Sequence, residues 1–144
     1  MFNKETYIKR RNKLKNDVEK GVLLFLGNNE SPMNYTDNTY HFRQDSNFLY
    51  FFGINHPNMA AIIDLETGDE VIYGDDYTID DIVWMGKQPS IAGRALECGV
   101  TKTASAARLS GDLHRIKSQR RKVHFLPPYR PENKVKLFEL LGIP

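Results

Sequence analysis

The sequence predicts an α/β domain in which helices flank a mixed β-sheet. A continuous apolar run, Val22–Leu26, has the length and composition of a strand buried on both faces. Segments 59–65 and 70–73 are strand-like and are joined by a tight Glu-Thr-Gly-Asp turn, which is typical of an antiparallel hairpin. Segments with helical spacing separate this hairpin from a fourth apolar strand at 123–126. Helices and strands therefore alternate along much of the chain.

Length and composition fit one globular domain. The 144 residues are 40% hydrophobic and 26% charged, which is ordinary for a globular protein. No apolar run approaches the ~20 residues of a membrane span, and the basic N-terminus lacks the apolar stretch of a secretory signal. The single cysteine, Cys98, excludes an internal disulfide framework and a cysteine-based metal site. We therefore expect a cytoplasmic domain without a membrane partner.

The first 39 residues predict a helix, the first strand and a loop. Residues 4–20 have amphipathic helical spacing, and Gly21 is placed to cap the helix end. The apolar face of this helix carries Tyr7, Leu14 and Val18. The polar segment 28–39 follows the first strand and has no period, which predicts a surface loop.

The stretch from Tyr40 to Ile54 predicts a short aromatic helix. Asp45 and Ser46 carry oxygens that can accept the free N–H groups of a first helical turn. The apolar face would then carry Phe48, Phe51 and Phe52. Gly53 suits the left-handed residue that ends a helix, and Ile54 can supply the apolar contact after it. A helix this short is unstable alone, so we expect it to dock on the core.

The second half of the chain predicts three further helices and a strap. Residues 79–85 form a short helix or an irregular strap that carries Trp84. A helix over 91–98 begins at Ser90, and Thr103 caps the next one. That helix spaces Ala106, Leu109, Leu113 and Ile116 on one face. The last helix, 134–141, is followed by Gly-Ile-Pro, which we interpret as the start of a linker.

The reactive residue types lack catalytic spacing. Carboxylates could hold a divalent ion at Asp75, Asp76, Asp80 and Asp81. These acids lack the alternation and the glycine of a calcium loop, so a solvated loop and helix start is the favoured interpretation. Cys98 has helical spacing with Ile91 and Ala95, which favours a small core residue over a nucleophile. Trp84 is more typical of a core or an interface than of a cofactor contact.

The run from Arg115 to Lys122 holds five positive charges and could bind phosphates. It has no interleaved aromatic residues to stack on bases, so a solvated turn is favoured. No phosphate loop, nucleophile elbow or metalloprotease motif is present. We predict no catalytic residue, metal ligand or cofactor on this chain, and no nucleic-acid partner.

The segment Tyr40–Pro57 resembles the signature of the N-terminal domain of Xaa-Pro aminopeptidases (aminopeptidase P, of the creatinase–prolidase group). The matching residues are Tyr40, Arg43, Gln44, Ser46, Phe48, Tyr50, Gly53 and Pro57. Asp81-Ile-Val-Trp-Met-Gly86 is similar to an acidic-Ile-Trp-x-Gly element of the family. His41 replaces a proline of the signature and Leu49 replaces a frequent tryptophan.

This resemblance implies a ribonuclease H-like topology and makes residues 1–144 the non-catalytic N-terminal domain of a larger enzyme. In the family, a C-terminal pita-bread domain, absent from this chain, holds two divalent metal ions, typically manganese. It removes the N-terminal residue before proline from short X-Pro peptides. The N-terminal domain supports oligomerisation and borders the substrate pocket, often a neighbour's. The implied partners are the chain's own catalytic domain, neighbouring subunits and X-Pro peptides, and the chain alone should be inactive.

The resemblance also supplies candidate site residues. Candidates for the substrate pocket or a domain interface are Tyr40, Arg43, Leu49, Tyr50 and Trp84. We expect Arg43 either to pin the polar loop or an acidic side chain, or to face the catalytic domain or bound peptide together with Tyr40 and Tyr50. The alternative function is a stand-alone ligand- or protein-binding domain of the same fold, without a peptidase partner domain.

Overall fold

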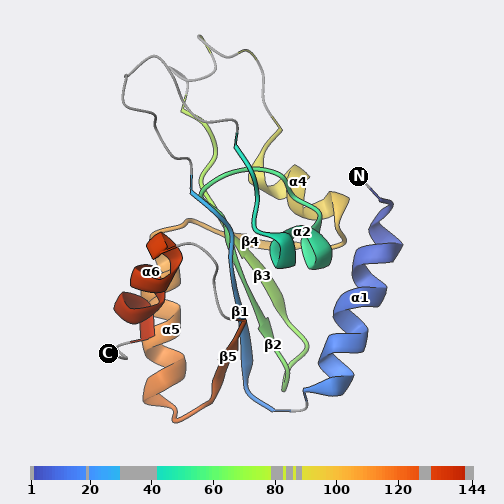
Figure 1. The fold of residues 1–144 in the computed structure, drawn as a ribbon. Helices are drawn as coiled ribbons and strands as arrows, with labels where there is room; N and C mark the ends of the chain where they lie inside the picture. Colours follow the sequence, from blue (N-terminus) through green and yellow to red (C-terminus); the bar gives the residue numbers. More distant parts are fainter. Residues whose placement is uncertain are drawn as a thin grey trace.

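One mixed five-stranded sheet forms the centre of the domain (Figure 1). The computed structural model describes residues 2–18, 20–29, 42–78, 83, 86, 89–126 and 131–141. The strands are β1 (Val22–Leu26), β2 (Ala60–Asp64), β3 (Glu70–Tyr73), β4 (Lys102–Ala104) and β5 (Val123–Phe125). Their order is β4-β3-β2-β1-β5, with β1, β2 and β3 antiparallel, β4 parallel to β3 and β5 parallel to β1. The predicted α/β class, hairpin and ribonuclease H-like topology are confirmed.

Helices cover both faces of this sheet. The helices are α1 (Lys4–Asp17), α2 (Ser46–Phe52), α4 (Ile91–Glu97), α5 (Arg108–Ser118) and α6 (Pro131–Leu141). In Figure 1, α1, α2 and α4 lie on one side of the sheet, and α5 and α6 on the other. Leu23 and Phe25 of β1 pack in the α1–α2 core cluster, whereas Val22 and Leu24 pack with α5 and α6. Alternate side chains of β1 thus fill two cores, which explains its unbroken apolar run.

The short aromatic helix α2 forms as predicted. The Asp45 carboxylate accepts hydrogen bonds from the backbone N–H groups of Asn47 and Phe48 at 3.0 and 3.1 Å. The side chains of Phe48 and Phe52 are fully buried, and the Phe52 ring lies edge-on to Phe25 with centroids 5.3 Å apart. Gly53 ends the helix with φ +67°. The helix is therefore docked on β1, as the sequence requires.

The end of α1 was predicted too late. The helix stops at Asp17, and Val18 caps it by donating its N–H to the Leu14 carbonyl. Gly21 lies instead immediately before β1 with φ +97°, where an added Cβ would be 2.6 Å from the Lys122 carbonyl oxygen. The glycine is required by the close approach of the chain leading to β5, and not by a helix cap.

The prediction that Thr103 caps a helix is wrong. Thr103 belongs to β4, where it pairs with Ile72, and α5 begins later, at Arg108, without a side-chain cap. The last helix begins at Pro131 and not at Lys134, because proline suits the first helical turn. The predicted strap 79–85, apart from Val83, and most of the predicted loop 28–39 lie outside the described residues. Within the described part of the chain, no helix has the length and apolarity needed to cross a membrane.

Candidate interface on the first two helices

Three of the five candidate site residues lie in the described structure. Leu49 and Tyr50 lie on α2, away from its buried Phe48 and Phe52, and Tyr50 is 51% exposed. Arg43 precedes the helix and is exposed. Tyr40 and Trp84 lie outside the described residues. The helix thus presents one face to the core and an aromatic residue to the surface.

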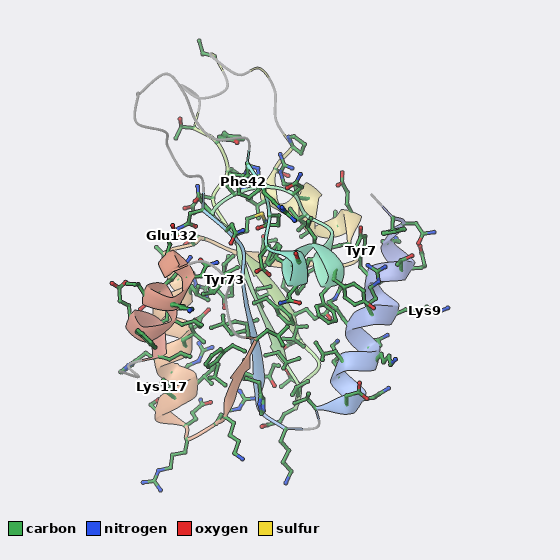
Figure 2. The ribbon with its side chains drawn as sticks, viewed as in Figure 1. Tyr7, Lys9, Phe42, Tyr73, Lys117 and Glu132 are labelled. Atoms are coloured by element: carbon green, nitrogen blue, oxygen red, sulfur yellow. The ribbon has the colours of Figure 1, made fainter. Side chains whose placement is uncertain are left out.

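Arg10 connects α1 to this outer part of α2. Its Nη1 donates a hydrogen bond to the Tyr50 carbonyl at 2.9 Å. Its guanidinium carbon lies 4.1 Å from the Tyr50 ring centroid, 5.0 Å from that of Phe2 and 5.7 Å from that of Tyr7. A cation over aromatic rings is attracted to their π faces. Figure 2 shows Tyr7 between α1 and α2, with Lys9 directed away from the sheet.

These side chains border an open groove of about 510 Å³. Its lining residues are Phe2, Tyr7, Arg10, Ser46, Leu49, Tyr50, Gly53 and Asn55. None of these described lining residues carries a carboxylate, imidazole or thiol. An apolar groove with one cation is suited to hold another surface. We name it the α1–α2 groove.

Gln44, and not the side chain of Arg43, fixes the start of the signature motif. The buried Gln44 Oε1 accepts from the N–H groups of Asn28 at 2.8 Å and Asp45 at 3.1 Å. Its Nε2 donates to the carbonyls of Ile54 at 3.0 Å and His56 at 2.9 Å. A neutral amide can satisfy donors and acceptors together, which a guanidinium cannot. This role of Gln44 was not predicted from the sequence. The one indication of it was the presence of an amide side chain within an aromatic motif.

Two further buried amides, those of Asn28 and Asn133, link the hydrogen bonds of Gln44 to α6. Asn28 Nδ2 donates to the Arg43 carbonyl at 3.0 Å, and Asn133 Nδ2 donates to Asn28 Oδ1 at 2.9 Å. The backbone of Arg43 is therefore part of the connection. Among the residues that the structure describes, none accepts a hydrogen bond from the Arg43 guanidinium, so the role predicted for that side chain stays a prediction.

Arg11 is a buried charge that sequence reasoning did not find. Only 1% of it is exposed, and its Nε donates to Glu70 Oε2 of β3 at 2.9 Å. Its Nη1 and Nη2 donate to the carbonyls of Phe51 and Cys98 at 2.8 and 2.7 Å. These carbonyls belong to the C-terminal ends of α2 and α4, where helix dipoles favour a cation. The sequence did contain an indication of this burial, because Arg11 follows Tyr7 by four positions and therefore lies on the apolar face of α1.

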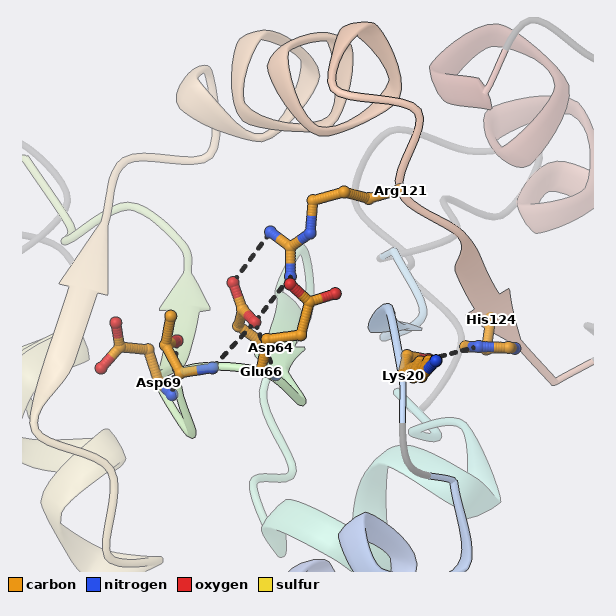
Figure 3. Close-up of polar contacts among 7 residues, drawn as sticks. Lys20, Asp64, Glu66, Asp69, Arg121 and His124 are labelled. Carbon is orange, nitrogen blue, oxygen red and sulfur yellow. Dashed lines mark hydrogen bonds and ion pairs between the residues drawn. The ribbon is translucent and has the colours of Figure 1, made fainter.

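A second ion pair joins the hairpin turn to the segment before β5 (Figure 3). Arg121 Nη1 and Nη2 bind the two Asp64 carboxylate oxygens at 3.0 and 2.7 Å. Burial alone would raise the pKa of Asp64, but hydrogen bonds from Arg121 and from the N–H groups of Glu66 and Thr67 lower it overall. Near this pair, His124 Nε2 lies 2.9 Å from the Lys20 carbonyl oxygen. The ion pair therefore stabilises the contact between the hairpin and the segment that precedes β5.

Some of the positively charged side chains in the run 115–122 bind other groups of the same domain. Arg115 contacts Asp112 at 3.4 Å, and Lys117 Nζ donates to the Leu141 carbonyl of α6. Together with Arg121, three of the five cations thus have intramolecular partners. The run therefore offers fewer free charges to a phosphate backbone than its sequence indicates.

Asp75 and Asp76 accept hydrogen bonds from backbone groups of other segments, and Cys98 is buried. Asp76 Oδ1 accepts the N–H of Ile91 at 2.6 Å where α4 begins, and Asp75 Oδ1 accepts the N–H of Ala106 at 3.2 Å. Asp80 and Asp81 lie outside the described residues. Burial raises the pKa of the Cys98 thiol to about 11, so it is protonated near neutral pH and a poor nucleophile. In the described part of the chain, no three His, Cys, Asp or Glu side chains are placed to hold a metal ion, so these residues do not fit the metal pair of the implied enzyme.

Comparison with known proteins gives a consistent result. The family model of the aminopeptidase P N-terminal domain matches residues 7–124. A human Xaa-Pro dipeptidase is 32% identical over 71 residues, which is 49% of this chain and 14% of the relative. A probable Xaa-Pro aminopeptidase of Talaromyces stipitatus is 30% identical over 80 residues, which is 56% of this chain and 16% of the relative.

The fold is shared with a solved enzyme. Aminopeptidase P from Escherichia coli in its low-pH form superimposes with a TM-score of 0.79 at 18% identity. The match covers 99% of this chain and 33% of that one. The complex of the same enzyme with the inhibitor Pro-Leu gives a TM-score of 0.77. The chain spans about a third of this enzyme and a smaller share of the two sequence relatives. It belongs to the aminopeptidase P N-terminal domain family.

Proposed function

We propose that residues 1–144 are the non-catalytic N-terminal domain of a Xaa-Pro-cleaving metallopeptidase whose catalytic domain follows in the chain. The family match over residues 7–124 carries this proposal. It is supported by the fold, which corresponds to one third of a solved aminopeptidase P. In the proposed enzyme, the following domain holds two divalent metal ions, with manganese as the expected metal, and cleaves short X-Pro peptides. The single cysteine, buried and unpaired, is compatible with a cytoplasmic location.

The proposed role of this domain is to meet other parts of the enzyme, to support oligomerisation and to border the substrate pocket. The α1–α2 groove supports this role because it is open and largely apolar. Leu49 and Tyr50 lie on it, and Arg43 is exposed nearby in the chain. In this proposal these three side chains face the catalytic domain or a neighbouring subunit.

The proposal is tested by comparing this chain with the longer protein that its reading frame encodes. With Mn²⁺ and a peptide carrying proline in the second position, the 144-residue chain should release no amino acid. The longer protein should cleave this peptide and leave a matched peptide with alanine in the second position intact. Turnover by the short chain, or none by the longer protein, would contradict the proposal.

A stand-alone binding domain of the same fold is the second candidate. The α1–α2 groove favours it, because an open apolar groove can hold a ligand or a partner without a catalytic domain. The reading frame beyond Pro144 separates the two candidates. A downstream set of Asp, His and Glu metal ligands supports the peptidase, whereas an immediate stop codon supports the binding domain.

A further inference from the structure

An open hollow of about 520 Å³ lies on the face of the sheet that carries α5. A volume of about 300–1,000 Å³ is typical of sites that bind small molecules. The apolar residues that line the hollow belong to the core cluster on this side of the sheet, and they are Ile62, Val71, Ala104 and Ile116. The hollow therefore offers an apolar surface to a ligand. We name it the β3–α5 hollow.

Positively charged side chains from three parts of the chain line the same hollow. They are Lys102 of β4, Arg108 and Arg115 of α5, and Arg121 of the segment that precedes β5. Arg108 and Arg115 are seven residues apart on α5, which is about two turns of a helix, so both lie on the same flank. Cations of a helix and of an edge strand thus border one apolar surface.

Two of the three carboxylates that line the hollow are bound by a cation. Both oxygens of Asp64 accept hydrogen bonds from Arg121, at 3.0 and 2.7 Å. Asp69 Oδ1 lies 2.7 Å from Lys102 Nζ. Glu66, which approaches Arg121 at 3.5 Å, does not line the hollow. Figure 3 shows Asp64, Asp69 and Arg121 together. These two pairs leave little net charge in their part of the hollow.

The third carboxylate, Asp112, has a hydroxyl partner and a weak cationic one. It accepts a hydrogen bond from the Tyr73 hydroxyl at 2.6 Å, and Arg115 Nη1 lies 3.4 Å from its other oxygen. The Arg115 side chain is 61% exposed, so most of its N–H groups stay available. Among the ion pairs of the described residues, none includes Arg108. The lining residues thus carry one positive charge more than they carry negative charges.

The environment of Tyr73 indicates that both arginines of α5 act on the same part of the hollow. Burial raises the pKa of the Tyr73 hydroxyl, and its hydrogen bond to Asp112 raises this pKa further. The positive charges of Arg108 and Arg115 lower the same pKa. The fields of the two guanidinium groups therefore overlap at this hydroxyl, and an anion near it would be attracted by both.

We propose that the β3–α5 hollow binds a small organic anion, whose apolar part lies on the sheet and whose carboxylate or phosphate group is held by Arg108 and Arg115. A guanidinium binds either group through two parallel hydrogen bonds. The cations select for negative charge, and the apolar residues select for a ligand that also has a hydrophobic part. The hollow and the α1–α2 groove lie on opposite faces of the sheet, so the inference does not depend on the proposed function.

NMR titration of the isotope-labelled 144-residue chain with phenyl phosphate and with phenylacetate tests the inference. Each probe joins a ring to an anionic group, and the tighter of the two identifies the preferred anion. Binding should be saturable and should shift the backbone amide signals of Tyr73, Ala104 and Arg108. Benzyl alcohol, which lacks the charge, and inorganic phosphate, which lacks the ring, should bind severalfold more weakly. No binding of either ring-bearing anion, or equal binding of inorganic phosphate, would overturn the inference.

Removing single charges locates the site. Arg108→Gln and Arg115→Gln should each weaken binding of the tighter probe by about tenfold, because each loses a charged hydrogen-bond donor. Both side chains are exposed, so the melting temperature should not change. Arg120→Gln is the matched control, because Arg120 is exposed beyond the end of α5 and does not line the hollow. Equal weakening by Arg120→Gln would indicate general attraction to a basic surface and overturn the inference.

Substitutions of Thr101 give a readout that leaves every arginine in place. Thr101 is exposed and lines the hollow. Thr101→Glu adds a carboxylate there and should weaken binding of the tighter probe severalfold, whereas the neutral Thr101→Gln, of similar size, should not. Equal effects of the two substitutions would overturn the inference. None of these measurements uses peptidase activity, so their outcome is separate from the test of the proposed function.

Discussion

The Arg11 guanidinium lies inside the domain and binds three acceptors from different elements. Replacing Arg11 with methionine keeps much of the side-chain volume but leaves Glu70 and the carbonyls of Phe51 and Cys98 without this donor. Breaking a buried pair costs about 3–5 kcal/mol. Lys15 also contacts Glu70, at 3.0 Å, so this carboxylate would keep one cationic partner. We therefore expect the free energy of unfolding to fall by about 3 kcal/mol, at the lower end of this range, as measured by urea titration.

Lys13→Met is the matched control for Arg11→Met. It removes the same charge from an exposed position of the same helix, so the free energy of unfolding should change by no more than about 0.5 kcal/mol. Equal effects of the two substitutions would show that the Arg11 hydrogen bonds add nothing to stability.

Gln44→Glu tests the amide that holds the signature motif. The new carboxylate would still accept from Asn28 and Asp45, but it would face the carbonyls of Ile54 and His56 without a donor. Burial should raise the folded-state pKa of this carboxyl above its unfolded value of about 4.3. The destabilisation should therefore be small below pH ~4.3 and grow as the pH rises toward neutrality. Urea titrations at pH 4 and pH 7 would measure this difference.

A glutamine at an exposed site controls for the added charge. Gln119→Glu introduces the same carboxylate beyond the C-terminus of α5, where the side chain is exposed. Its effect should be small at both pH values. A Gln44→Glu defect that does not depend on pH would mean that loss of the amide donor, and not the buried charge, controls stability.

At the scale of an element, α2 depends on the glycine that ends it. Gly53 has φ +67°, and an added Cβ would lie 2.2 Å from Tyr7 Cζ. Gly68 in the hairpin turn has a similar φ of +80° but has no atom within 4 Å of such a Cβ. Gly68→Ala should cost about 1 kcal/mol through backbone strain alone, whereas Gly53→Ala should cost clearly more. Thermal denaturation of both variants tests this, and equal costs would contradict it.

The same helix shows what the sequence can predict about this fold. Asp45, Phe48 and Gly53 act within one or two helical turns, so their pattern predicted the cap, the buried face and the end of α2. β4 was missed because its three residues, two of them exposed, have no periodic pattern and form a strand only by pairing with β3. Gly21 was misassigned because the residue it contacts, Lys122, is distant in the sequence. Features that depend on neighbouring residues could be predicted from the sequence, whereas features that depend on pairing between distant segments could not.

The candidate site shows the same division. Helical spacing places Leu49 and Tyr50 away from the buried Phe48 and Phe52, so their position on the surface of α2 follows from the sequence. The α1–α2 groove does not, because one of its walls is Arg10, which contacts Tyr50 forty residues away in the chain. Arg10 and Arg11 are adjacent in the sequence, yet only the fold shows that one borders the groove and the other is buried.

At the scale of the whole molecule, the Asp64–Arg121 pair joins the hairpin to the segment that leads into β5. The lowered pKa of Asp64 means that its stabilisation is present above the unfolded pKa of about 3.9 and is lost as the pH falls below it. Arg121→Met should therefore destabilise the domain at pH 7 by about 1–2 kcal/mol, since the pair is largely but not fully buried. The defect should shrink below pH 4.

Arg120→Met is the control for this pair, because Arg120 is exposed beside it and loses the same charge. Its effect should be within about 0.5 kcal/mol at both pH values. Urea titrations at pH 7 and pH 3 compare the variants with the unsubstituted chain. A defect in Arg121→Met that is the same at both pH values would exclude the ion pair as its origin.

The parallel pairing of β1 with β5 has a consequence for the order of synthesis. Val22 pairs with Val123, about a hundred residues later in the chain. On the ribosome, β1 emerges long before β5 exists, so the hydrogen-bonding edge of β1 that faces β5 stays unpaired through most of translation. Unpaired apolar edges are the places where nascent chains misassociate. A stalled chain that lacks Val123 would therefore have one edge of β1 open, and would be a natural substrate for chaperones.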